Sequence, residues 1–207
     1  MRIFFEVDDI MNANPATVTR LGMIYMEIQS QNWKKLMESY CSKLPETLSD
    51  EKINFILENM NSLVGIAFQF INEKCNFIIY LDPLILVNSF LNMFDSQISE
   101  IKSKEYQIPA NFEYLVWNGL IFGLVWGIGG LLDESSREKF SQFFKEIFLN
   151  KYQKTESTFE GIEKVIKNNQ YIKILEEFNL FEQVYNRKDN CWIHWIKTIP
   201  LFQIPKT

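Results

Sequence analysis

The chain has 207 residues, of which 47% are hydrophobic and 23% are charged, and its formal net charge is −5. This length accommodates one domain or two small ones, and the apolar share suffices for a buried core. Because the net charge is negative and the lysines and arginines are scattered, we expect no nucleic-acid partner. The three cysteines are far apart and there is a single histidine, so we expect no metal site.

The first 28 residues predict two strands that flank a short helix. Apolar runs at 3–7 and 23–26 have the composition of strands, and the polar stretch between them ends in Arg20. A short helix ending there places the Arg20 side chain at the tip of a sheet, pointing away from the core. From the residues alone, Arg20 is either a functional cation or a surface arginine that the helix dipole favours.

Residues 31–101 predict three helices joined by short links, with an apolar link at 76–81. Each helix has apolar side chains at helical spacing and is bounded by residues typical of helix ends. The expected spans and bounding residues are 31–44 ended by Pro45, 50–71 capped by Ser49, and 83–101 capped by Asp82 with Pro83 in the first turn.

The most apolar stretch, residues 114–132, is uncharged and long enough to cross a bilayer. Its flanks are acidic and lack the basic anchors of a membrane span, and five glycines lower its hydrophobicity. We therefore expect a buried helix from about Phe112 that loosens or stops near Gly127, Gly129 and Gly130. A membrane-associated protein built on this stretch remains an alternative.

The last third of the chain predicts one long helix followed by mixed structure. Ser135 and Glu138 predict a capping box at the start of that helix. Its apolar face is expected to be core, not a ligand cage, and consists of Phe140, Phe143, Phe144, Ile147 and Phe148. Residues 161–182 predict a further helix or, in part, an extended insertion. A turn at 186–190 then leads to a strand at 192–197.

Three blocks of the sequence resemble dynein heavy chains. The first, at residues 4–27, contains PATVTRLGMIYME and is similar to the ASPATVSRCGMVYME signature of the second AAA+ module in that family. The others are LVWNGLIFGLVWGIGGLLDESSREKFSQFF at 115–144 and WIHWIKTIPLFQIPKT at 192–207. Thr19 and Leu21 stand where the family usually has serine and cysteine. The first block is more similar to axonemal than to cytoplasmic members.

The resemblance implies a mainly α fold that is part of an AAA+ module. Residues 1–28 would end the large α/β subdomain of the second module with two strands of its sheet. Residues 29–152 would form the helical small (lid) subdomain, and residues 153–207 a connector and the first strand or strands of the third module. The chain would be a fragment of an ATP-driven motor ring in the ciliary axoneme. Its expected partners are neighbouring AAA+ modules and, indirectly, microtubules and other dynein chains, with no membrane.

The resemblance also implies roles for four residues. Arg20 would be an arginine finger that reaches in trans into the ATP site of the neighbouring module, where a planar cation offsets charge on the transferred phosphoryl group. Asp8 and Asp9 would lie near the γ-phosphate of the module's own site, where their charge disfavours catalysis. Arg137 would face nucleotide from the small subdomain. The plainer alternatives are helix N-terminal carboxylates for Asp8 and Asp9 and a solvated side chain for Arg137.

The 207 residues contain no P-loop of the form G-x-x-x-x-G-K-[ST]. Without the backbone amides of that loop, we expect the isolated chain neither to hold ATP or Mg²⁺ tightly nor to hydrolyse ATP. Those cofactors would act only in the complete heavy chain. The rival hypothesis is a non-enzymatic helical interaction module with no nucleotide role. His194 has no candidate nucleophile near it in sequence and is expected to be a surface strand residue.

Overall fold

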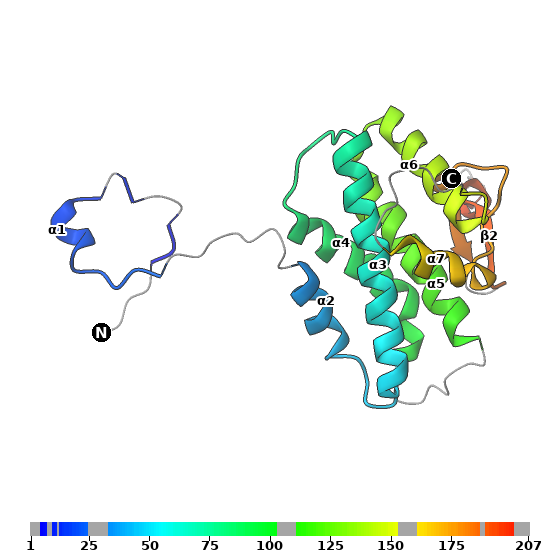
Figure 1. Cartoon of the computed structure of the whole chain (residues 1–207), viewed down its shortest axis with the longest axis horizontal. Coiled ribbons are helices and arrows are strands. Elements are labelled where there is room, and N and C mark those ends of the chain that lie inside the picture. Colours follow the sequence, from blue (N-terminus) through cyan, green and yellow to red (C-terminus); the bar gives the residue numbers. More distant parts are fainter. Residues whose placement is uncertain are drawn as a thin grey trace, which may run out of the picture.

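The computed structural model describes residues 5–7, 10–11, 13–24, 33–102, 111–152, 161–186 and 189–200. Figure 1 shows a body of packed helices with α3 (Asp50–Lys74) running through it and α1 (Pro15–Val18) drawn apart from it. The strands lie on the opposite side of this view from α2 (Trp33–Cys41). A mainly α fold is thereby confirmed.

The body contains further helices that follow α2 and α3 in the chain. These are α4 (Pro83–Ile98), α5 (Phe112–Gly123), α6 (Glu134–Phe148) and the short α7 (Ile162–Lys167). Short helical turns extend or connect them, of which η2 (Leu124–Ile128) is π-helical. The others are 3₁₀ turns: η1 (Ser99–Lys102), η3 (Gly129–Leu131), η4 (Asn169–Tyr171), η5 (Leu180–Glu182) and η6 (Trp195–Thr198). The hairpin strands are β1 (Gln183–Asn186) and β2 (Cys191–His194).

Short-range sequence signals set most of the helix ends. A carboxylate oxygen of Asp82 accepts a 2.7 Å hydrogen bond from the backbone N–H of Leu84, which caps α4 as predicted. Ser49 precedes α3 at the predicted position, although its side chain makes no capping hydrogen bond. The helix expected at 31–44 ends earlier, at Cys41, because the next residues turn more tightly and Leu44 N–H bonds to the Cys41 carbonyl.

The capping box predicted at Ser135 is wrong. The residue that caps α6 is Asp133, two residues before Ser135, and its carboxylate oxygen accepts a 2.7 Å hydrogen bond from Ser136 N–H. The hydroxyl of the next residue, Ser136, bonds to another part of the fold: it accepts a 2.9 Å hydrogen bond from the backbone N–H of Asn76. Asp133 therefore takes the cap position predicted for Ser135, whose hydroxyl donates a 3.2 Å bond to the Asp133 carboxylate.

The apolar stretch is a buried helix whose hydrogen-bond pattern changes near its glycines, as expected. Helix α5 ends at Gly123, then η2 is π-helical and η3 is a 3₁₀ turn. The whole Phe112–Leu131 segment is long and apolar enough to cross a membrane, but 67% of its most apolar window is buried in the described structure. A Cβ on Gly127 would lie 2.6 Å from Cα of Phe90, so glycine lets α4 approach this closely.

Aromatic side chains dominate the core between α3, α4, α5 and α6. The largest fully buried side chains include Trp117, Phe90, Phe94, Phe112, Phe140, Phe144 and Phe148. The predicted apolar face of α6 is buried as a whole. Because each such side chain contributes about 1.5–3 kcal/mol by leaving water, this cluster is the main source of stability of the body.

The region 161–182, expected to be a helix or in part an extended insertion, is divided into short helical pieces with an irregular stretch at 172–179. Only α7 and two short 3₁₀ turns form there, after which β1 and β2 pair antiparallel with Val184 opposite Ile193. The buried side chain of Gln183 explains the irregular path, because its amide donates to the carbonyls of Leu175 and Phe178, both at 2.9 Å. The strand expected at 192–197 ends at His194, where η6 begins.

The N-terminal segment contains the predicted short helix but no strand among its described residues. The side chain of Asn14 caps α1, accepting a 2.9 Å hydrogen bond from Ala16 N–H, and Pro15 lies in the first turn. The described parts of the two expected strands, residues 5–7 and 23–24, have no regular structure. A strand requires a hydrogen-bonded neighbour, and none is supplied by the described residues.

Candidate functional site

Arg20 lies just beyond the end of α1 and its side chain is exposed. The local path is fixed by backbone hydrogen bonds, with Arg20 N–H donating to the Thr17 carbonyl at 3.1 Å. Within the described part of the chain, no carboxylate forms an ion pair with the Arg20 guanidinium.

The other two residues of the N-terminal prediction, Asp8 and Asp9, lie outside the described residues. Their described neighbours Phe5 and Val7 are 73% and 62% exposed. The predicted proximity of the two carboxylates to a γ-phosphate thus stays a prediction.

Arg137 lies in the first turn of α6, as the sequence predicted, but its guanidinium turns inward. Nη2 donates a 2.6 Å hydrogen bond to the carbonyl of Gly130 in η3. Cζ lies 5.7 Å from the centroid of the Phe181 ring. Nε is shielded from water and has no hydrogen-bond partner among the described residues. Arg137 is thus not the freely solvated side chain that its place in a first helical turn would favour.

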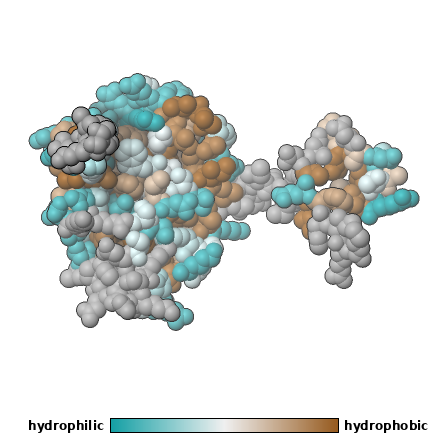
Figure 2. All heavy atoms as spheres, turned by 180° about the vertical axis from the view of Figure 1, so that it is seen from behind, coloured by the Kyte–Doolittle hydropathy of each residue, from teal (hydrophilic) through white to brown (hydrophobic). Residues whose placement is uncertain are grey.

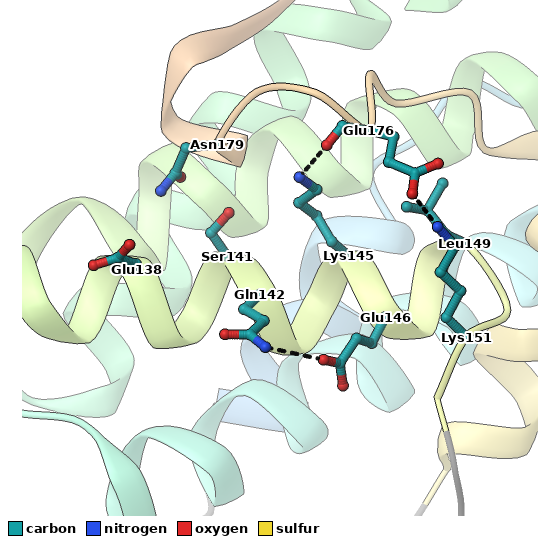
Figure 3. A pocket seen from close by; sticks show the side chains of 9 residues that line it. All are labelled: Glu138, Ser141, Gln142, Lys145, Glu146, Leu149, Lys151, Glu176 and Asn179. Carbon is teal, nitrogen blue, oxygen red and sulfur yellow. Dashed lines mark hydrogen bonds and ion pairs between the residues drawn. The ribbon is translucent and has the colours of Figure 1, made fainter.

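A shallow pocket of about 400 Å³ lies along the outer face of α6. Figure 3 shows Ser141 and Lys145 of α6 pointing toward the irregular segment that carries Glu176 and Asn179. Lys145 donates hydrogen bonds to the backbone carbonyls of Glu176 and, at 3.1 Å, Phe178. Lys151 forms an ion pair with the Glu176 carboxylate, so both lysines of the pocket are engaged within the chain.

The charges of this pocket hold the segment before β1 against α6. The hydrogen bond and charge of Lys151 lower the pKa of the Glu176 carboxyl below its usual value. On α6 itself, Gln142 donates a 3.2 Å bond to a carboxylate oxygen of Glu146. Lys151 is thus paired with a carboxylate, whereas Lys145 is bound by backbone carbonyls.

No metal centre is found in the described residues. They contain no group of three or more histidine, cysteine, aspartate or glutamate side chains placed to hold a metal ion. The three cysteines are free thiols, and burial raises the pKa of Cys41 to about 11, which disfavours the reactive thiolate. His194 is half-buried, and its Nδ1 accepts a 3.3 Å bond from Ile196 N–H.

Two buried polar residues, which hold the hairpin and the segment before it in place, were not singled out in the sequence. Asn118 of α5 is fully buried, and its Oδ1 accepts a 2.5 Å bond from the indole N–H of Trp192. Gln183 is fully buried and bonds four backbone groups of the segment before it. Asn118 could have been identified from the sequence, because it is a polar residue inside an apolar run.

The surface also exposes a group of apolar side chains. Four of them lie close in sequence, in the link before α4 and in its first turn, and are more than half exposed: Ile78, Ile79, Tyr80 and Ile85. Figure 2 shows apolar surface gathered on one side of the helical body. Contiguous exposed apolar surface of this kind is typical of a contact face.

The sequence pattern of the dynein heavy chain AAA lid domain matches residues 56–197. Among similar curated proteins, dynein axonemal heavy chain 3 of Mus musculus is 32% identical over 157 residues, covering 72% of this chain. Dynein axonemal heavy chain 3 of Homo sapiens has the same identity over the same length. Dynein axonemal heavy chain 12 of Rattus norvegicus is 28% identical over 203 residues, covering 94% of the chain.

These relatives are far longer than this chain. The chain spans 4% of the length of the mouse and human relatives and 6% of the rat relative. No solved structure matches the chain. The matched pattern begins within α3 and ends in η6, so it covers most of the helical body and the hairpin.

Proposed function

The chain belongs to the family of dynein heavy chain AAA lid domains, and from this premise we propose that it serves an ATP-driven, microtubule-based motor of the ciliary axoneme. In this function the helical body acts as a nearly rigid lid that relays nucleotide-driven closure to the next AAA+ module. The densely packed aromatic core supports this role, because close-packed interiors transmit displacement instead of absorbing it.

Arg20 supplies the catalytic contribution in trans to the ATP site of the neighbouring module. The observation that carries this proposal is the exposed Arg20 side chain at the end of α1, with no ion pair to a described carboxylate. An exposed guanidinium at this position can meet the charge that spreads over the transferred phosphoryl oxygens.

The test is turnover of the complete heavy chain with Arg20→Ala. Loss of an arginine finger costs roughly 10³- to 10⁵-fold in turnover, with a smaller effect on ATP affinity. Arg20→Lys retains the charge but loses the planar donors and should recover only part of the activity. Lys35→Ala, at an exposed position of α2, is the matched control and should leave turnover unchanged. An unaltered microtubule-stimulated turnover in Arg20→Ala would remove the assignment.

Neighbouring AAA+ modules of the same heavy chain are the proposed partners. The exposed apolar side chains before α4 support this, since burying them against a neighbour is favourable by roughly 25 cal/mol per Å² of apolar surface. Microtubules and other dynein chains are reached indirectly. ATP and Mg²⁺ are bound in the complete heavy chain, with Asp8, Asp9 and Arg137 as secondary candidates for nucleotide contact.

A further inference from the structure

Phe181 is a half-buried aromatic residue in η5 that reaches into the junction of three elements. Its ring contacts Trp126 of η2 edge-on, with 6.0 Å between centroids, and Phe140 of α6 at 6.2 Å. It also lies against the backbone of η3, because a Cβ on Gly129 would be 2.8 Å from Cζ of Phe181. The ring is thus a wedge between the end of the apolar helix and α6.

The same ring covers the guanidinium of Arg137. Cζ of Arg137 lies 5.7 Å from the ring centroid, while Nη2 donates to the carbonyl of Gly130, the neighbour of Gly129. Nε of Arg137 is excluded from water and has no hydrogen-bond partner among the described residues. An unpaired buried N–H is unfavourable, so something must hold the guanidinium where it lies. The Gly130 carbonyl and the Phe181 ring are the described groups that do so.

The wedge is itself firmly placed. The side chain of Asn179 and the carboxylate of Glu182 form a capping box around η5. The backbone N–H of Leu180, next to Phe181, donates a 2.9 Å buried hydrogen bond to the hydroxyl of Ser141 on α6. Strand β1 begins two residues after Phe181, at Gln183. The position of the ring is therefore tied to α6 on one side and to the β-hairpin on the other.

We propose that Phe181 is the positioning residue for Arg137, holding its guanidinium against η3 and keeping Nε dry. The role of Arg137 toward nucleotide rests on the proposed function, whereas its placement by Phe181 does not. In the complete motor, the hairpin and the guanidinium would then move together through this ring. The interaction is a cation–π contact in a partly desolvated place, where such contacts are strongest.

The test follows the Nε–H proton of Arg137 by nuclear magnetic resonance in the 207-residue chain. The sequence has four arginines, so Arg137→Lys identifies the signal by removing it. We expect this Nε–H to exchange with water more slowly than that of Arg20. Phe181→Leu keeps an apolar side chain but removes the ring face, and should speed the exchange roughly 5- to 30-fold.

Gly129→Ala is the second variant, because its methyl group displaces the Phe181 ring without removing it, and it should also speed the exchange. The control is Phe68→Leu, which removes a comparable half-buried ring that contacts Trp33 edge-on at 5.6 Å, and which should change nothing at Arg137. Exchange at the wild-type rate in both Phe181→Leu and Gly129→Ala would overturn the proposal.

A separate measurement distinguishes this proposal from the proposed function. Nucleotide affinity of the complete heavy chain is compared for Phe181→Leu, Arg137→Ala and the Phe68→Leu control. A change in the first two variants supports a nucleotide role for Arg137. Unchanged affinity in Arg137→Ala would remove that role, while the exchange measurement would still decide whether Phe181 positions the guanidinium.

Discussion

The indole N–H of Trp192 donates a 2.5 Å hydrogen bond to Oδ1 of Asn118, joining two side chains that are 3% and 0% exposed. The Nδ2 group of Asn118 in turn donates to the carbonyl of Tyr114, one helical turn earlier. The hydroxyl of Tyr114 donates to the carbonyl of Asn190 in the hairpin turn. The hairpin is therefore fastened to the apolar helix α5 by polar groups inside an otherwise apolar core.

Removing the acceptor of this bond should destabilise the whole body. In Asn118→Ala the buried indole N–H of Trp192 is left unpaired, and we expect the free energy of unfolding to fall by about 1–3 kcal/mol. Denaturant titration measures this. Asn92→Ala, at an exposed position of α4, is the control and should stay within about 0.5 kcal/mol of wild type. Equal stabilities of the two variants would show that the bond contributes nothing.

Two glycines should respond to the same substitution with opposite signs. In Gly127→Ala the new methyl group would lie 2.6 Å from Cα and 2.7 Å from N of Phe90, so α4 must shift. We expect a loss of about 1–3 kcal/mol. In Gly65→Ala, within α3, nothing lies within 4 Å of the new Cβ, and better helix propensity should add roughly 0.5–1 kcal/mol. The measurement is thermal or denaturant unfolding; a stabilised Gly127→Ala would contradict the close helix crossing.

The Asp133 cap should make part of the stability depend on pH. Hydrogen bonds from Ser136 hold the pKa of the Asp133 carboxyl below its ordinary value of 3.8. Because the folded-state pKa is the lower one, the ionised cap stabilises the fold above pH 3.8, and this contribution is lost as the pH falls through the folded-state pKa. Asp133→Ala should therefore be less stable than wild type at neutral pH, with a smaller difference in acid.

Asp133→Asn is the matched control for this titration. Asparagine caps a helix without a titratable group, so its stability relative to wild type should improve as the pH falls below 3.8. Urea unfolding at neutral and acid pH gives both comparisons. A pH-independent difference between wild type and Asp133→Asn would exclude the ionised cap.

The isolated chain should neither bind ATP tightly nor hydrolyse it. Its sequence lacks the P-loop, and the two lysines that line the pocket on α6 are already engaged with the segment around Glu176. Isothermal titration with ATP and Mg²⁺, together with a phosphate-release assay, checks this expectation. A clear micromolar binding curve would be incompatible with it.

The capped helices show how far short-range signals reach. Asp82 followed by Pro83 marks a helix start that the structure contains. The phenylalanine spacing in α6 predicted its buried face, since a helical period of 3.6 residues places those rings on one side. The family resemblance, which depends on the order of residues along the chain, needed no structure.

The predictions fail for two different reasons. In the segment before β1 and at the start of α6 the deciding bonds are local: Gln183 bonds backbone groups four to eight residues before it, and the Asp133 carboxylate accepts from Ser136 N–H. The inward turn of Arg137, by contrast, depends on a ring that is 44 positions further along the chain, at Phe181.

The sequence by itself therefore determined the helices, their buried faces and the family, because these follow from propensity, capping and periodicity within a few residues. The tertiary structure alone decided the pairing of Asn118 with Trp192 and the confinement of Arg137. The physical reason is that a buried polar group must find a hydrogen-bond partner wherever the fold brings one near, and its position along the chain does not specify that partner.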